Sequence, residues 1–431
     1  MMPVRSGEEQ MGAYSEAVKS GLYNKKSGLV GKYDNVRRYW EDEITRLWLR
    51  GPLYQLIERS RRDMRRLRIL DLGCGSADGY ELLTGVRQRD ADIHQVEVNL
   101  LNEEVLGLYK GSDLNEDLLD QAREIYGDNP KMVFEQGSFT EGLPIAKDET
   151  PYDLYFTSFG TMSHHNDDET AITMLADIAK RCEKYCVIVC DWLGRYSYEW
   201  QSLWTNTPED LLNMDYVVSY IYEPEERERR RAELQHLTLR LMSRGEAEHI
   251  IDEAAKRAGV KIKPMMFFDR SVFIGRHLDT QEYNPYAQPM RRVVNSLHET
   301  NVRTELHSLL IDYAPKQGFE TLNCYFEHLQ MCWNALVRYT QELLDGYDET
   351  QRTFENEPDI PASYPKRLQD MMLRMRTVIQ GVGWLDYGLP RENIIEPQLG
   401  YALRSLVMEL QQGQGAGHGL VGVFMVDKEN D

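Results

Sequence analysis

The stretch LRILDLGCGSADGYELL, residues 67–83, decides the fold class of this 431-residue chain. A short apolar run reaches Asp71 and Leu72, glycines follow at positions 73, 75 and 79, and the apolar residues after them have helical spacing. This order predicts a buried strand, a tight turn and a helix. Such a turn presents backbone N–H groups and a helix N-terminus at the carboxyl edge of a parallel sheet, where nucleotide-like ligands bind in open α/β folds.

Apolar runs alternate with helical stretches along the chain after this unit. Strands are predicted over residues 105–112, 132–136, 152–157 and 185–190, with helices over 116–126 and 169–184. A helix over 243–260, with Ser243 as N-cap and Glu246 completing a capping box, precedes two closing strands over 261–269 and 271–277. The short link between these last strands predicts antiparallel neighbours. The alternation predicts an α/β fold, a doubly wound parallel sheet with helices on both faces.

Three parts of the chain differ in pattern. Residues 1–66 are highly charged and predicted to be helical, and residues 67–280 are the predicted α/β domain, with a helical insertion over 193–242. The polar stretch around Pro285 and Pro289 is a predicted boundary. Residues 281–431 are predicted as a mostly helical C-terminal domain that ends in an apolar strand over 420–426. This domain would cover the functional site of the α/β domain or mediate homo-oligomer formation.

Charge and cysteine content bear on partners and location. The chain has 70 acidic and 50 basic side chains, a formal net charge of −20. Because a net acidic field repels phosphate backbones and anionic membranes, we expect neither nucleic acid nor membrane as a partner. The six cysteines are few for this length, the N-terminus lacks a signal-peptide pattern, and no apolar run has the length of a membrane span. These features predict a cytoplasmic protein.

Residue 78 bears on which ligand the turn binds. The dinucleotide fingerprint expects a third glycine at this position, and the chain has Asp78 there. A carboxylate would repel a diphosphate, whereas it would attract a ligand that carries an ammonium and a sulfonium group. The turn therefore favours S-adenosylmethionine over NAD.

Four motifs in chain order resemble those of the class I S-adenosylmethionine-dependent methyltransferases of small-molecule type. They are LRILDLGCGSADGYELL (67–83), YKGSDLN (109–115), FEQGSF (134–139) and YDLYFTSFGTMSHH (152–165), and RSVFIGRH (270–277) is similar to part of the family's closing hairpin. The resemblance covers about residues 30–280 and implies a seven-stranded Rossmann-like sheet, an N-terminal helical lid and S-adenosylmethionine as cofactor. The chain departs from the pattern at Ala77, where many members have glycine, and at Ser138, where an aspartate often contacts adenine.

The resemblance also implies a set of cofactor-binding residues. Asp113, which closes the second strand motif, would accept both ribose hydroxyls, because a carboxylate offers two oxygens. In the predicted lid segment, residues 23–39, Tyr33 would lie over the sulfonium and Arg38 would pair with the methionyl carboxylate. Surface positions on an amphipathic helix are the alternative for this pair. The expected set is Tyr33, Arg38, Asp71, Gly73, Cys74, Gly75, Asp113, Leu114, Ser138, Phe139, Ser158 and Phe159.

The acceptor side of the expected site has two components. His165, or else His164, follows the fourth strand motif and would be a general base, since the ordinary pKa of histidine suits proton abstraction near neutrality. The alternative is that these histidines only pack or cap the next helix. Trp192, Tyr196 and Trp200 would form an apolar wall for a planar acceptor, or they belong to the core.

The function that follows is methyl transfer from S-adenosylmethionine to a small-molecule acceptor, by in-line displacement. Protein or peptide methylation and a non-catalytic S-adenosylmethionine-binding regulator are the alternatives. Cys324, His328 and Cys332 share one helical stripe, but zinc ligands usually pair across a turn, so no metal site is predicted.

Overall fold

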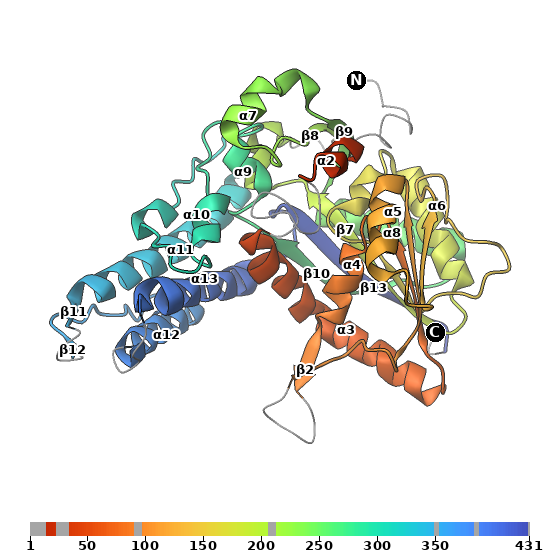
Figure 1. The fold of residues 1–431 in the computed structure, drawn as a ribbon, viewed down its shortest axis with the longest axis horizontal. Coiled ribbons are helices and arrows are strands. Elements are labelled where there is room, and N and C mark those ends of the chain that lie inside the picture. Colours follow the sequence, from red (N-terminus) through yellow and green to blue (C-terminus); the bar gives the residue numbers. More distant parts are fainter. Residues whose placement is uncertain are drawn as a thin grey trace.

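The computed structural model describes residues 14–22, 34–89, 97–205, 213–348, 353–382 and 388–429. Seven strands of these residues form the main path of one sheet, in the order β10-β13-β7-β6-β1-β4-β5 (Figure 1). Their bounds are β1 Leu67–Leu72, β4 Leu106–Asp113, β5 Met132–Gln136, β6 Leu154–Phe156, β7 Tyr185–Gly194, β10 Lys263–Arg270 and β13 Gly419–Asp427. Neighbouring strands are parallel, except that β13 is antiparallel to both β10 and β7. The predicted doubly wound α/β fold is confirmed.

The two faces of the sheet bury separate hydrophobic clusters. Side chains alternate along β7, so that Val187 and Val189 join one cluster and Ile188 and Cys190 join the other. Helices α3 (Asp42–Arg62), α4 (Asp78–Thr84) and α5 (Glu116–Tyr126) cover the first face, and α6 (Asp168–Arg181) and α8 (Arg244–Ala258) cover the second. The predicted capping box of Ser243 and Glu246 is present at the start of α8.

The predicted hairpin of two strands over 261–269 and 271–277 is wrong, because a different strand lies beside the first of them. Residues 271–275 are not a strand: Ser271 has φ +60°, and the chain leaves the sheet for α9 (Arg276–Thr280). Phe273 and Ile274 are apolar because they pack against the helical region. Strand β13, from the predicted C-terminal domain 281–431, takes the place beside β10, and its residues are almost all buried between two strands. Residues 271–418 therefore connect two neighbouring strands.

The insertion over 193–242, predicted as helical, contains two strands. Strand β8 (Asn213–Val217) pairs with β9 (His236–Met242), and β9 also pairs with the end of β7. Leu237, Leu239 and Leu241 of β9 alternate with Thr238 and Arg240 and enter one cluster, as a strand requires. The only α-helix among the described residues of this insertion is α7 (Pro224–Arg229).

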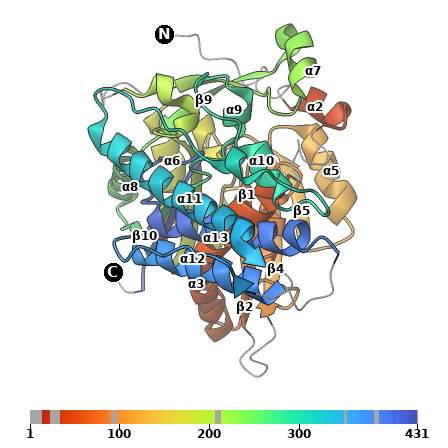
Figure 2. The same cartoon turned by 90° about the vertical axis from the view of Figure 1, so that its left-hand side faces the viewer.

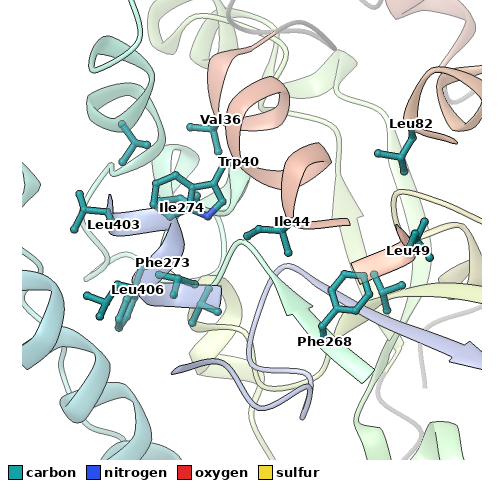
Figure 3. Close-up of a cluster of buried hydrophobic side chains, with 14 of the residues drawn as sticks. Val36, Trp40, Ile44, Leu49, Leu82, Phe268, Phe273, Ile274, Leu403 and Leu406 are labelled. Atoms are coloured by element: carbon teal, nitrogen blue, oxygen red, sulfur yellow. The ribbon is translucent and has the colours of Figure 1, made fainter. Parts of the chain in front are cut away.

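The helices between β10 and β13 form a bundle beside the sheet. After the short helix α9 they are α10 (Arg291–Ser296), α11 (Glu320–Gly346), α12 (Lys366–Val382) and α13 (Glu396–Leu410), and the last three pack on one another (Figure 2). A π-helical turn, Arg37–Glu41, leads into α3 and carries Trp40 to this bundle, 5.8 Å from the ring of Trp333. Trp40 belongs to the same buried cluster as Leu403 and Leu406 of α13 (Figure 3). The N-terminal helix, the sheet and the bundle therefore share one core.

Short elements complete the fold: α2 (Ser15–Lys19), β2 (Arg87–Arg89), β3 (Glu97–Asn99), β11 (Tyr347–Asp348), β12 (Thr353–Phe354), a second π-helical turn (Arg391–Ile395) and 3-10 turns at Thr161–His164, Tyr198–Leu203, Arg231–Glu233 and Leu306–Leu309. Among the helices in the described ranges, none is long and apolar enough to cross a bilayer.

Gly194 gives a direct test of the way β13 enters the sheet. It ends β7 where the loop before β13 crosses, and a Cβ there would collide with the carbonyl oxygens of Gly417 and Gly415, the latter at 2.6 Å. Because backbone atoms cannot move aside cheaply, Gly194→Ala should lower the free energy of unfolding by about 2 kcal/mol. Gly245→Ala is the matched control, since a Cβ at that helical position meets nothing within 4 Å. Urea denaturation with equal midpoints for the two variants would contradict this crowding.

Candidate active site

The turn after β1 and the end of β4 are joined by hydrogen bonds. Gly73 and Gly75 have φ of +66° and +53°, and a Cβ on Gly73 would lie 2.5 Å from Cγ2 of Thr161. The N–H of Gly75 donates to Oδ2 of Asp113 at 2.8 Å, and the N–H of Asn115 donates to Oδ1 at 2.8 Å. Asp113 is the last residue of β4. Its carboxylate is therefore fixed at the carboxyl edge of the sheet, beside the glycine turn.

A cavity of about 140 Å³ lies over this edge. Nine of the predicted site residues line it: Gly73, Cys74, Gly75, Asp113, Leu114, Phe139, Ser158, Phe159 and His164. Asp78 and Thr140 also line it, as does Tyr14 from the N-terminal segment. Two carboxylates, those of Asp78 and Asp113, are therefore part of the lining close to the turn.

A second cavity of about 70 Å³ adjoins the first. Tyr14, Asp78, Phe159 and His164 line both cavities, so the two share a wall. Apart from Gly160, Leu193 and Leu239, the rest of the second cavity is charged or aromatic: Arg37, Glu41, Tyr216, Tyr220, Arg270, Arg276 and His418. The second space suits a small polar molecule rather than an apolar one.

Phe159, in the shared wall, is held in a strained backbone conformation. Its φ is +57°, and its N–H donates to Oδ2 of Asp191 at 2.8 Å. The guanidinium carbons of Arg37 and Arg270 lie 4.4 Å and 5.3 Å from the centre of its ring. Arg270 also bonds both oxygens of Asp191. Such strain persists only where surrounding contacts fix it, and it is common at functional sites.

The strand order, taken with this edge, decides the fold family. Numbered along the chain, the seven main strands lie in the order 3-2-1-4-5-7-6, with the seventh reversed. A glycine turn follows the first strand and an aspartate ends the second. The fold is that of the class I methyltransferases.

Solved structures with the methyltransferase fold are similar to this chain. Magnesium protoporphyrin IX methyltransferase from Synechocystis PCC 6803, with S-adenosylhomocysteine bound, is 11% identical over 61% of this chain and 92% of its own, with a TM-score of 0.32. CalS10, an aminopentose methyltransferase from Micromonospora echinaspora, is 15% identical over 58% and 89%, with a TM-score of 0.29. An S-adenosylmethionine-dependent methyltransferase from Clostridium acetobutylicum is 12% identical over 50% and 82%, with a TM-score of 0.31. No protein-family model and no curated protein matches the chain.

Several predicted cofactor residues of this methyltransferase fold lie outside the first cavity. Asp71 is fully buried behind the turn, where the Tyr109 hydroxyl donates to it. Burial raises the pKa of Asp71 to about 8 despite that hydrogen bond, and the nearby carboxylates of Asp113 and Asp78 act in the same direction. Ser138 bonds the hydroxyl of Thr140, at 2.9 Å, rather than lining the cavity. Tyr33 lies outside the described residues.

Arg38 is also displaced from its predicted role. Its side chain is exposed and lies over the ring of Tyr39, whereas its neighbour Arg37 is buried and lines the second cavity. One residue along a helix turns the side chain by about 100°, so only one of two adjacent arginines can point inward. Arg37 lies 3.4 Å from Oδ1 of Asp78, at the shared wall.

The predicted aromatic wall belongs to the core. Trp192 is fully buried in the cluster beneath α6 and α8. Trp200 is fully buried and donates from Nε1 to the carbonyl of Gly194 at 2.8 Å. Tyr196 packs against the other main cluster. None of the three lines either cavity, because their spacing follows the alternation of β7 and the turn after it.

The two predicted histidines differ in their position relative to the cavities. His165 is buried against Phe139, and its Nδ1 lies 3.1 Å from the hydroxyl of Thr170, away from both cavities. His164 lines both cavities. Burial lowers the pKa of each to about 4, so both are neutral at neutral pH. Of this pair, only His164 can reach a molecule in the site.

Several residues that line the cavities were not among the predicted site residues. Asp78 bears on the choice of ligand in the sequence, but it was not predicted as a site residue. No sequence motif around Tyr14 or His418 marks them as site residues, since they reach the cavities from parts of the chain that are far apart in the sequence.

Proposed function

We propose that this protein transfers a methyl group from S-adenosylmethionine to a small polar acceptor. The observation that carries the proposal is the pair of adjoining cavities at the carboxyl edge of the sheet. One is built on the glycine turn and Asp113, and the other is small and lined by charged groups.

The residues of the first cavity fit the cofactor. Asp113 would hold the ribose hydroxyls, since its carboxylate is fixed at the carboxyl edge of the sheet and lines the cavity, and a carboxylate has two oxygens that accept hydrogen bonds. Gly73 leaves space where a Cβ would meet Thr161. The carboxylates of Asp78 and Asp113 suit the ammonium and sulfonium groups and would repel a diphosphate. Arg37 takes the role expected of Arg38, facing the methionyl carboxylate.

The second cavity would hold the reacting end of the acceptor. S-adenosylmethionine supplies an electrophilic methyl group, whose carbon–sulfur bond breaks, with its electron pair left on sulfur, as the acceptor's lone pair bonds the methyl carbon. The chain's part is to hold the acceptor close to the shared wall of Phe159 and His164 and to exclude water, because positioning supplies much of the rate in such displacements. A histidine of this cavity would take the acceptor's proton.

Calorimetry with three ligands tests the cofactor class. We expect S-adenosylmethionine and S-adenosylhomocysteine to bind in one-to-one stoichiometry and NAD not to bind. Release of S-adenosylhomocysteine on incubation with a metabolite extract would then separate an enzyme from a binding protein. Binding of NAD with displacement by neither sulfur nucleoside would refute the proposal.

A further inference from the structure

We propose that His418, oriented by Glu199, is the base that removes a proton from the acceptor in the second cavity. The inference rests on the proposed function and adds to it the class of acceptor: an alcohol, a phenol or an amine. Glu199 lies in the 3-10 turn after β7, and His418 immediately precedes β13, 219 residues later.

Glu199 is a buried carboxylate fixed from three sides. Its Oε1 lies 2.7 Å from Nδ1 of His418, its Oε2 accepts the backbone N–H of His277 at 2.7 Å, and the hydroxyl of Ser197 donates to Oε1 at 3.3 Å. A Cβ on Gly275 would overlap the carboxylate, so the chain approaches it as closely as glycine permits. Burial opposes the charge on Glu199, but His418 and His277 outweigh that effect and lower its pKa.

Backbone hydrogen bonds and a ring contact also fix the position of His418. Its backbone N–H donates to the carbonyl of Ser271 at 3.2 Å, and its own carbonyl accepts the N–H of Gly194 at 3.1 Å. Its ring packs against Trp200, with the ring centres 5.7 Å apart. Because the carboxylate accepts Nδ1–H, the lone pair of the neutral ring is on Nε2. No hydrogen bond to Nε2 is present within the described part of the chain, and the ring lines the second cavity.

The other histidine of the cavity is a weaker candidate. His164 has no carboxylate to orient it among the described residues, and burial lowers its pKa to about 4, which leaves little driving force for taking a proton. The charged and titratable groups near His418 are Glu199 and His277 on one side and, around the cavity, Tyr14, Arg37, Glu41, Asp78, His164, Tyr216, Tyr220, Arg270 and Arg276.

The proton balance defines the acceptor class. A hydroxyl or an ammonium group gives its proton to Nε2 of His418, which frees the lone pair that bonds the methyl carbon, and the proton passes from Nε2 to solvent after the product leaves. A carboxylate acceptor needs no base, because it is already ionised at neutral pH. The arrangement of Glu199 and His418 therefore points to an acceptor with an O–H or N–H bond at the reacting atom.

Variants of the pair give the test. Tritium-labelled S-adenosylmethionine would be supplied with a panel of alcohols, phenols, amines and carboxylates. We expect transfer to an O–H or N–H acceptor and a fall in kcat of about 100-fold or more in His418→Gln, with cofactor affinity unchanged. Glu199→Gln should also lower kcat, since the ring of His418 would lose the carboxylate that orients it. His249→Gln, on the exposed face of α8, is the matched control and should match the wild type.

The outcomes separate this inference from the proposed function. A chain that binds no S-adenosylmethionine refutes both. A chain that binds it, but whose His418→Gln variant keeps full turnover at every pH, overturns the base assignment alone, as does transfer to carboxylates only. If a single variant fails to fold, the double variant Glu199→Gln/His418→Gln removes both charged groups of the pair and takes its place.

Nuclear magnetic resonance of the imidazole nitrogens needs no acceptor. A protected Nδ1 proton on His418 that disappears in Glu199→Gln, with an Nε2 that titrates, would support the pair. A ring protonated on Nε2 in its neutral form would overturn the assignment whatever the acceptor panel shows.

Discussion

Arg291→Leu should lower the free energy of unfolding by about 3–5 kcal/mol, because it removes the cation that two buried carboxylates share. The guanidinium bonds both oxygens of Asp34, at 2.8 and 2.9 Å, and Oε1 of Glu41 at 2.8 Å. All three side chains are almost fully buried. The cluster joins the N-terminal segment to the helices that follow α9, so its loss should affect the whole shared core. Urea denaturation followed by tryptophan fluorescence measures the change.

Arg292→Leu is the matched control. The neighbouring arginine pairs with Glu223 at 2.6 Å, but both side chains are at least half exposed, and such a surface pair contributes about 1 kcal/mol or less. Similar unfolding midpoints for the two variants would show that the buried cluster contributes little.

The same cluster gives an acid dependence. Burial opposes ionisation of Glu41, but Arg291 and Arg270 outweigh it and hold its pKa well below the ordinary range. A carboxylate with a lowered folded pKa stabilises the fold above its unfolded pKa of about 4.3 and loses that contribution as the pH falls further. In Arg291→Leu the pKa of Glu41 rises, so the loss of stability below that pH should become shallower than in the wild type.

Asp113→Ala should weaken S-adenosylmethionine binding by about 3 kcal/mol, which is about 150-fold in Kd. Two charge-assisted hydrogen bonds to the ribose would be lost, and the turn would lose the carboxylate that its Gly75 N–H donates to. Asp113→Asn keeps one acceptor oxygen and should give a smaller loss. Isothermal titration calorimetry measures both.

Asp120→Ala controls for a lost negative charge near the site. Asp120 lies on α5, is exposed and pairs with Arg123 at 2.9 Å, so its removal should leave the affinity unchanged. If Asp113→Ala bound the cofactor as tightly as this control, with an unchanged melting temperature, Asp113 would have no part in ribose binding.

The features that could be predicted are those that depend on residues close together in the sequence. The glycine turn, the aspartate that ends β4 and the alternation of strands and helices each depend on a few consecutive side chains. For that reason the sheet forms as expected, and nine of the predicted site residues lie together around the first cavity. Arg38 was predicted to face the site, but its neighbour Arg37 does. The π-helical turn at Arg37–Glu41, which sets the direction of these side chains, has no clear signature in the sequence.

The features that were missed depend on long-range pairing. Strand β13 and the hairpin strand predicted over 271–277 are both apolar, and only the competition for the place beside β10 distinguishes them. Glu199 and His418 indicate a function only as a contacting pair. They lie 219 residues apart in the sequence, so no local pattern predicts their contact. The position of Trp192, by contrast, could have been predicted locally. Side chains alternate along β7, and this alternation places Trp192 in the same core cluster as Ile188 and Cys190.

The position of β13 has a consequence during synthesis of the protein. Strands β7 and β10 leave the ribosome long before residues 419–427, so both wait with an unpaired edge while the whole helical bundle is made. Unpaired strand edges are sites where chains associate wrongly. Folding of the nascent chain therefore depends on β13 both to seal the sheet and to bring His418, the proposed base, into place, so neither is completed before residues 418–427 have left the ribosome.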